Sequence, residues 1–140
     1  MPFTTSPNTF GGSIWQAGRA PVIDPAGNII VVTSNGSFNG VTDFGDSVLK
    51  LSSRDLSLLD WFTPDNWSAL CEDDKDLGSA GAILIRGTNQ LLTAGKPGDL
   101  LLLNVESMGH LAAMNSQNLQ ATQNEIYDFA LWNQPDSAIA

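Results

Sequence analysis

The amino-acid sequence predicts an all-β chain in which one four-stranded antiparallel unit is repeated. Its apolar residues come in short runs separated by Gly, Asn, Asp, Ser and Pro, which is typical of strands joined by tight turns. Helical periodicity is scarce along the 140 residues. In addition, the second half of the chain resembles the first half strand for strand, which indicates an internal repeat.

The first predicted hairpin covers residues 22–36, and residues 83–98 match it. Each copy has an apolar strand, a tight turn that ends in Asn28 or Asn89, a second apolar strand and a glycine-bearing loop. Asn and Gly favour such turns because both tolerate the left-handed backbone region at low cost. The sequence therefore predicts the same hairpin twice.

A second predicted hairpin covers residues 45–62 and is matched by residues 98–113. The two copies lie about 61 residues apart over the first hairpin and about 53 apart over the second. This difference is explained if the loop at 35–44 is about eight residues longer than its counterpart. A third unit begins at Asn124 with the sequence NEIYDFALWN.

A four-stranded unit that recurs at roughly 50 to 60 residues is typical of a β-propeller blade. We therefore expect a β-propeller segment of two four-stranded antiparallel blades plus a partial third blade. A closed ring needs about four to eight blades, and a small β-sandwich is the alternative fold. The expected parts are a lead-in at 1–12, a first blade at 13–66, an acidic inter-blade loop at 67–77, a second blade at 78–113, and a linker with the partial third blade at 114–140.

Seven motifs in one order carry a resemblance to a known family: IWQAG (14–18), APVIDPAGNIIVVTSNGSF (20–38), DFGDSVLKLS (43–52), LDWFTPDNW (59–67), DKDLGSAGAILI (74–85), LLTAGKPGDLLLLN (91–104) and NEIYDFALWN (124–133). Together they resemble the PQQ-repeat, or quinoprotein-like, β-propeller superfamily, in particular bacterial PQQ-like-repeat proteins. The resemblance implies that this chain is a segment of a longer propeller and that its relatives are often exported. It also implies that PQQ and calcium bind only in a complete ring.

Composition and charge limit the possible partners. The chain has fifteen acidic and six basic residues, a net charge of −9 and a pI of about 4.1. Such a chain repels phosphate backbones and anionic lipid surfaces, so we expect no nucleic-acid partner. No apolar run approaches the roughly 18 residues of a membrane span, so we expect no membrane insertion. The sequence leaves the compartment open, since residues 1–13 do not look like a secretory signal.

Carboxylates gather at two places in the sequence. Asp43 and Asp46 flank Phe44-Gly45 and are candidates for ligand binding, as an acid/base pair or a calcium shelf. Asp73, Asp74 and Asp76 are candidate calcium ligands in the acidic loop, because calcium prefers oxygen ligands. The spacing is not that of an EF-hand, and turn formation or a solvated loop also explains both groups.

Trp67 is the aromatic residue that we expect to face a ligand, because it lies in the predicted loop TPDNWSAL. Trp61 and Trp132 fall in predicted strands, where large aromatic side chains usually serve packing. His110 is the only histidine and falls in a predicted turn, where we expect it to be exposed.

These observations predict a non-catalytic β-propeller repeat module that acts as a binding or scaffold platform for a protein or carbohydrate partner. We expect it to require no cofactor. The alternative is a fragment of a PQQ- and calcium-dependent dehydrogenase acting on alcohols or sugars. Because an isolated segment leaves blade faces exposed, we also expect self-association through those faces.

Overall fold

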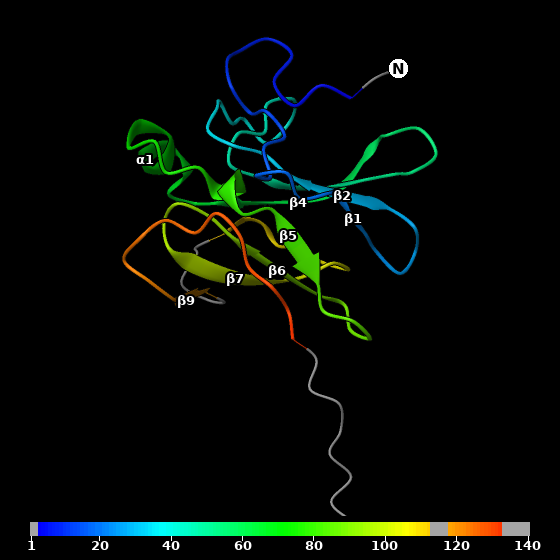
Figure 1. Ribbon diagram of the computed structural model, residues 1–140. Coiled ribbons are helices and arrows are strands. Elements are labelled where there is room, and N and C mark those ends of the chain that lie inside the picture. Colours follow the sequence, from blue (N-terminus) through cyan, green and yellow to red (C-terminus); the bar gives the residue numbers. More distant parts are fainter. Residues whose placement is uncertain (1–2, 113–117, 133–140) are drawn as a thin grey trace, which may run out of the picture.

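The computed structural model describes residues 3–112 and 118–132, whose strands form two stacked, open sheets (Figure 1). Sheet 1 has the strand order β1-β2-β3-β4-β8, and sheet 2 has the order β5-β6-β7-β9. The all-β expectation is confirmed in its coarser form, since the chain is mostly β with two antiparallel-rich sheets. Neither sheet closes on itself.

Sheet 1 is a four-stranded antiparallel meander with one parallel strand added at its edge. Within the meander, Val32 lies opposite Val48, and Val48 lies opposite Phe62. Its strands are β1 (Val22–Ile23), β2 (Ile29–Val32), β3 (Val48–Leu51), β4 (Leu58–Pro64) and β8 (His110–Ala112).

Sheet 2 is antiparallel throughout. It contains β5 (Ala82–Leu84), β6 (Gln90–Ala94), β7 (Asp99–Asn104) and β9 (Asn118–Gln120). Two short helices connect the sheets, α1 (Trp67–Glu72) and the 3-10 helix η1 (Leu77–Ser79). Part of the expected inter-blade loop at 67–77 is therefore helical.

The structure differs from the expected second blade in its last strand. Residues 110–112 form β8, which pairs in parallel with β4 of sheet 1 instead of extending sheet 2. Gly109 and His110 both have positive φ, and the His110 side chain reaches Asp60 of β4, so a contact between residues distant in the sequence places this strand. The fourth strand of sheet 2 is β9, which lies within the segment expected to be a linker.

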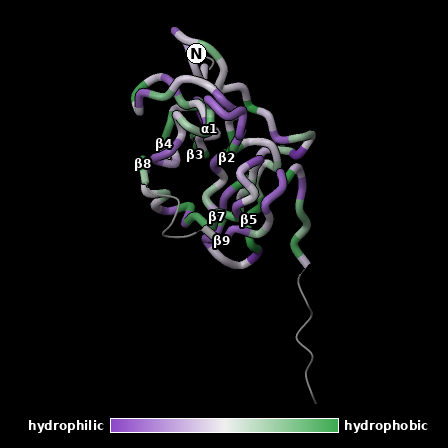
Figure 2. Tube along the Cα trace, turned by 90° about the vertical axis from the view of Figure 1, so that its left-hand side faces the viewer, coloured by the Kyte–Doolittle hydropathy of each residue, from purple (hydrophilic) through white to green (hydrophobic). Residues whose placement is uncertain are grey.

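The main core lies between the two sheets. Buried aliphatic residues of β2 and β3 pack there against buried leucines of β6 and β7. A second view places the labelled strands of sheet 1 above those of sheet 2, which shows the same two layers (Figure 2). The core also takes in Leu70 of α1 and Leu77 of η1, so both helices are anchored by apolar contact.

The side of sheet 1 that faces away from sheet 2 is covered. Val31, Leu49 and Leu51 form a second core cluster there with Phe44. The N-terminal segment and the connection between β2 and β3 lie over this side of the sheet (Figure 1). Among the described residues, the outward side of sheet 2 has no comparable cover, but it is covered at one end, where Ala94 of β6 is fully buried opposite Leu100.

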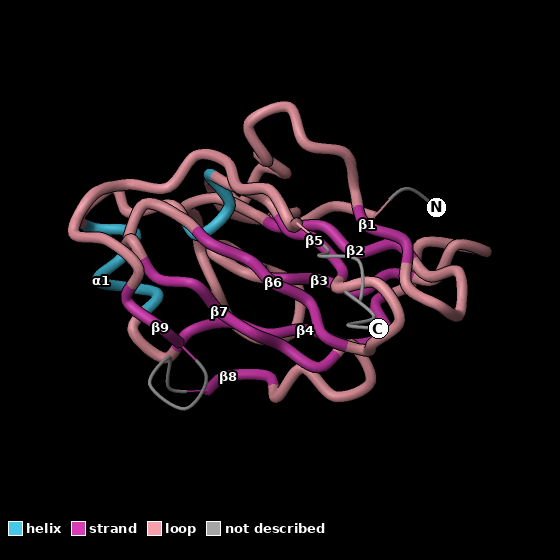
Figure 3. The backbone as a smooth tube through the Cα atoms, turned by 60° about the horizontal axis from the view of Figure 1, so that its bottom comes forward, coloured by secondary structure: helices cyan, strands magenta, loops and turns pink. Residues whose placement is uncertain are grey.

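The opposite surface, on sheet 2, is called the outer face here and consists of Ile83, Leu92, Leu100, Leu102 and Leu119. Residues directly opposite each other in adjacent strands share a face. Ile83, Leu92 and Leu102 follow one another in this way across three strands, and Leu100 lies opposite Leu119. None of the five belongs to either core cluster. In the view from below, β6 and β7 lie in front, with no described segment crossing them (Figure 3).

The chain leaves each sheet by crossing the connection between that sheet's second and third strands. After sheet 1, the Leu77 N–H donates to Asp46 Oδ1 at 3.0 Å, and Asp46 belongs to the β2–β3 connection. After sheet 2, the Ile126 N–H donates to the Gly95 carbonyl at 3.2 Å, and Gly95 belongs to the β6–β7 connection. The two repeat units therefore also resemble each other in the path that the chain takes when it leaves each sheet.

Glycine is required at position 78, where the first crossing segment lies against the backbone of Trp15 and Thr33. A Cβ atom on Gly78 would lie 2.7 Å from the Trp15 carbonyl oxygen and 2.8 Å from that of Thr33. Contacts this short to backbone atoms leave no room for a side chain. The two crossings also touch each other, because Ser79 Oγ donates to the Ile126 carbonyl at 2.7 Å.

Candidate functional site

A group of interacting charged and polar side chains lies where the chain passes from sheet 1 to sheet 2. We call it the junction cluster and define it as Asn35, Asp46, Asp74, Asp76 and Lys96. Lys96 Nζ lies 2.6 Å from Asp76 Oδ2 and 3.0 Å from Asp74 Oδ2. The Asn35 backbone N–H donates to Asp76 Oδ1, and its side-chain amide donates to Asp74. One lysine therefore links two carboxylates of the inter-sheet connection.

Asp46 is the most deeply buried member of the cluster, with 0% of its surface exposed. One of its oxygens accepts the Leu77 N–H, while Oδ2 has no hydrogen-bond partner. Burial raises the pKa of the Asp46 carboxyl to about 7, and the charges of Asp76 and Asp74 act in the same direction. The Leu77 hydrogen bond and Lys96 oppose this rise. Asp46 therefore retains its proton well above the usual range of a carboxylic acid.

Lys96 is charged within the cluster. Burial alone would lower the pKa of its ammonium group, but hydrogen bonds to Asp76 and Asp74 outweigh burial and raise that pKa. The ammonium also lies 5.5 Å from the centre of the Trp15 ring, a cation–π distance. Trp15 in turn contacts Tyr127 edge-on, so the C-terminal crossing segment reaches the same region.

The three candidate calcium ligands are not equivalent in the structure. Asp74 and Asp76 share Lys96 as their cation, whereas Asp73 is exposed at the C-terminal end of α1. Within 3–112 and 118–132, no group of three His, Cys, Asp or Glu side chains is arranged to hold a metal ion. The geometry gives Asp74 and Asp76 a structural role in joining the sheets.

Asp43 and Asp46 have separate hydrogen-bond partners. The Asp43 carboxylate accepts hydrogen bonds from Thr9 Oγ1 at 2.8 Å, Asn39 Nδ2 at 2.6 Å and Thr42 Oγ1 at 3.0 Å. These bonds tie the long β2–β3 loop together and to the N-terminal segment. Asp43 therefore organises a loop, and Asp46 belongs to the junction cluster.

Trp67 begins α1 and is half-buried, with its ring 5.5 Å from that of Phe38. Phe38 also contacts Trp61, whose ring stacks on His110 at 4.7 Å and 13°. Trp67 thus forms one end of an aromatic cluster over sheet 1 and keeps part of its surface open.

The group formed by His110, Asp60 and Trp61 was not anticipated from the sequence. His110 Nε2 lies 3.1 Å from Asp60 Oδ1, while Asp60 also accepts the Met108 N–H. The pair holds β8 against β4. The only sequence signal for this group is the polar residue Asp60 between apolar neighbours. That signal does not indicate which residue Asp60 contacts.

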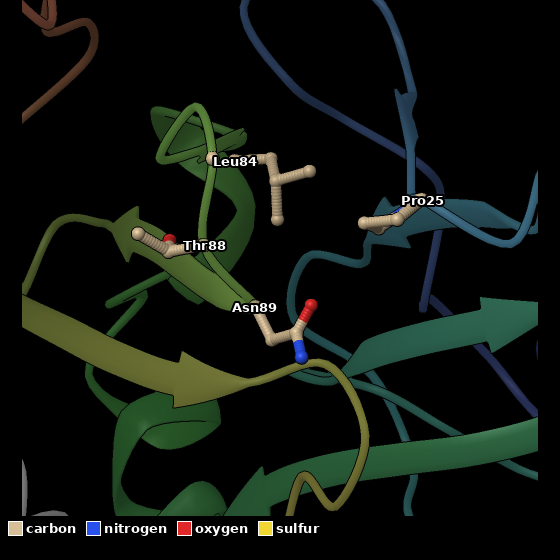
Figure 4. A pocket seen from close by; sticks show the side chains of 5 residues that line it. Pro25, Leu84, Thr88 and Asn89 are labelled. Carbon is tan, nitrogen blue, oxygen red and sulfur yellow. The ribbon is translucent and has the colours of Figure 1, made fainter.

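An open hollow of about 480 Å³ lies between the first hairpin turns of the two repeat units (Figure 4). It is lined by Pro25, Leu84, Gly87, Thr88 and Asn89. The labelled side chains of Leu84, Pro25 and Asn89 surround the open space in the close-up view. This lining provides one side-chain amide and one hydroxyl but no charged group.

Comparisons with protein-family models, with curated proteins and with solved structures found no match. Among the described residues, no helix has the length and apolar character needed to cross a membrane.

Proposed function

We propose that this chain is a non-catalytic β-propeller repeat module that serves as a binding or scaffold platform. The observation that carries the proposal is the repeated crossing: the chain leaves both sheets over the connection between their second and third strands. Repeat units of this kind bury their apolar faces by stacking on neighbours. An uncovered face at one end of the stack is then a natural place for a partner.

The roles of the acidic residues support a structural module. Asp43 is used in holding a loop, and Asp74 and Asp76 are used in holding Lys96 between the sheets. Asp46 accepts a backbone N–H from the inter-sheet connection. Each of these carboxylates therefore has a contact within the fold that explains its position.

We propose partners of two kinds for the platform. A protein, including a second copy of the chain, fits the uncharged outer face. A carbohydrate fits the aromatic cluster, where Trp67 is half-buried beside Phe38 and a sugar ring can stack on its open surface. Glycan binding that is lost in Trp67→Ala, at unchanged thermal stability, would support the carbohydrate partner, and unchanged binding would remove Trp67 as its site.

Titration with PQQ and calcium tests the proposed function against the dehydrogenase alternative. For a non-catalytic module, we expect no change in the melting temperature and no dehydrogenase activity with alcohols or aldose sugars when both are added. A ligand that binds the folded state raises the melting temperature, so a clear rise with PQQ and calcium together contradicts the proposal. The Asp74→Asn variant serves as the control for non-specific calcium binding by the acidic loop.

A further inference from the structure

The outer face of sheet 2 is an apolar surface. Like the core-facing side of the same sheet, it consists mainly of leucines. Ile83, Leu92 and Leu102 form one row across β5, β6 and β7, and Leu100 with Leu119 forms a second row. Leu102 is 37% exposed and Leu119 is 66% exposed, while the other three are half-buried. A contiguous, partly exposed apolar patch of this kind is a candidate interaction site.

The charge distribution favours a partner with the same face. The chain has a net charge of −9, yet none of the five residues of the outer face carries a charge. Two copies can therefore meet through this surface without placing like charges at its centre. A polycationic or nucleic-acid partner would find no charged group there to bind.

The number of uncovered faces decides how copies can combine. The outward side of sheet 1 already packs against Phe38 and Phe44, and the partly buried Phe3 adds to that cover. Sheet 1 of one copy is thus blocked from receiving sheet 2 of another, which rules out a head-to-tail ring of the described fold. An interface that uses the same surface on both partners is two-fold symmetric and stops at two copies.

The size of the outer face indicates a weak interface. Strands lie about 4.8 Å apart and rise about 3.3 Å per residue, so four short strands present on the order of 300 Å² in projection. A standard interface buries roughly 800 Å² per partner. Association through this face should therefore depend on concentration.

We propose that two copies of this chain dock through their outer faces, Ile83, Leu92, Leu100, Leu102 and Leu119, in a two-fold symmetric dimer. This inference rests on the proposed function, because it names the partner of the module's uncovered face. The sequence alone predicts self-association through the exposed faces of the blades. The proposed dimer uses only the outer face of sheet 2.

Sedimentation equilibrium between about 10 μM and 1 mM, the range in which weak complexes dissociate, tests this proposal. We expect the mass of the unmodified chain to rise from 14.9 kDa toward twice that value. Leu102→Glu places a charge in the centre of the interface, so this variant should stay at 14.9 kDa over the same range. Leu59→Glu is the matched control, because Leu59 is a 52% exposed leucine on β4 of sheet 1, and this variant should still dimerise.

Far-UV circular dichroism and thermal unfolding establish that each variant is folded. If Leu102→Glu does not fold, Leu119→Glu at the edge of the face takes its place, since Leu119 is largely exposed already. A monomer at every concentration overturns the proposal, as does a Leu59→Glu variant that is as monomeric as Leu102→Glu. Masses beyond two copies overturn the two-fold interface. PQQ binding would overturn the proposed function but leave this mass measurement unaffected.

Discussion

At the scale of single residues, Asp46 gives the molecule a pH-dependent junction. The pKa of its carboxyl is raised to about 7 in the folded chain from an ordinary value of 3.8, so the folded state keeps a proton that the unfolded state loses. The stabilising contribution is complete below about pH 4, falls as the pH rises toward 7 and is absent above it. The charged or titratable groups that face it are Asp74, Asp76, Lys96 and Cys71.

Asp46→Asn should therefore stabilise the chain at pH 8 and remove part of its pH dependence. Asn keeps an oxygen for the Leu77 N–H but has no charge to bury. At 1.36 kcal/mol per pKa unit, the difference from the unmodified chain should approach about 4 kcal/mol at pH 8 and vanish near pH 4. Urea unfolding of both proteins at several pH values measures this difference. A difference that stays constant from pH 4 to 8 would contradict the role given to Asp46.

Lys96 should be a sensitive residue of the junction cluster. Lys96→Met leaves the nearly buried Asp76 without its cation, and breaking a buried pair typically costs about 3 to 5 kcal/mol. Lys75→Met is the matched control, because Lys75 makes a longer, more exposed ion pair with Glu125 and should cost below about 1 kcal/mol. Chemical denaturation at pH 7 compares the two, and equal losses would show that the junction cluster does not hold the sheets together.

At the scale of elements, the strand that changes sheets is the feature most open to test. His110→Ala removes both the stacking on Trp61 and the contact of His110 Nε2 with Asp60 Oδ1. Because His110 is exposed, global stability should fall by only about 1 kcal/mol or less. Hydrogen exchange should nevertheless speed up at residues 110–112, with the amides of β6 unchanged as the internal control. If exchange in β8 does not change, the strand is held by other contacts.

Most strands of the two sheets can be predicted from the sequence, but the position of β8 cannot. The meander from β1 to β4 and the strands β5 to β7 follow from local patterns, since each has an apolar run bounded by turn residues. β8 does not, because its place depends on His110 meeting Asp60 and Trp61 about 50 positions earlier. The sequence pattern of residues 98–113 is the same whichever sheet receives the last strand.

The same limit applies to the candidate site. Asp46 and the acidic run are recognisable as separate groups because acidic residues in turn-forming segments stand out in a sequence. Their common partner Lys96 is not, because the contact exists only once the two sheets stack. Trp67 was expected in a loop, yet it begins a short helix whose Leu70 is anchored in the main core.

At the scale of the whole molecule, two repeated β units are stacked on each other, and one outer face of the stack is covered while the other is largely uncovered. The same sequence repeat also permits a β-sandwich with a different strand order, so the arrangement of faces requires direct measurement. Methyl–methyl nuclear Overhauser effects in a dilute, monomeric sample measure it. We predict contacts joining the methyl groups of Ile30, Val32 and Val48 on sheet 1 with those of Leu91, Leu101 and Leu103 on sheet 2. Contacts from Leu92 or Leu102 to sheet 1 would contradict the account.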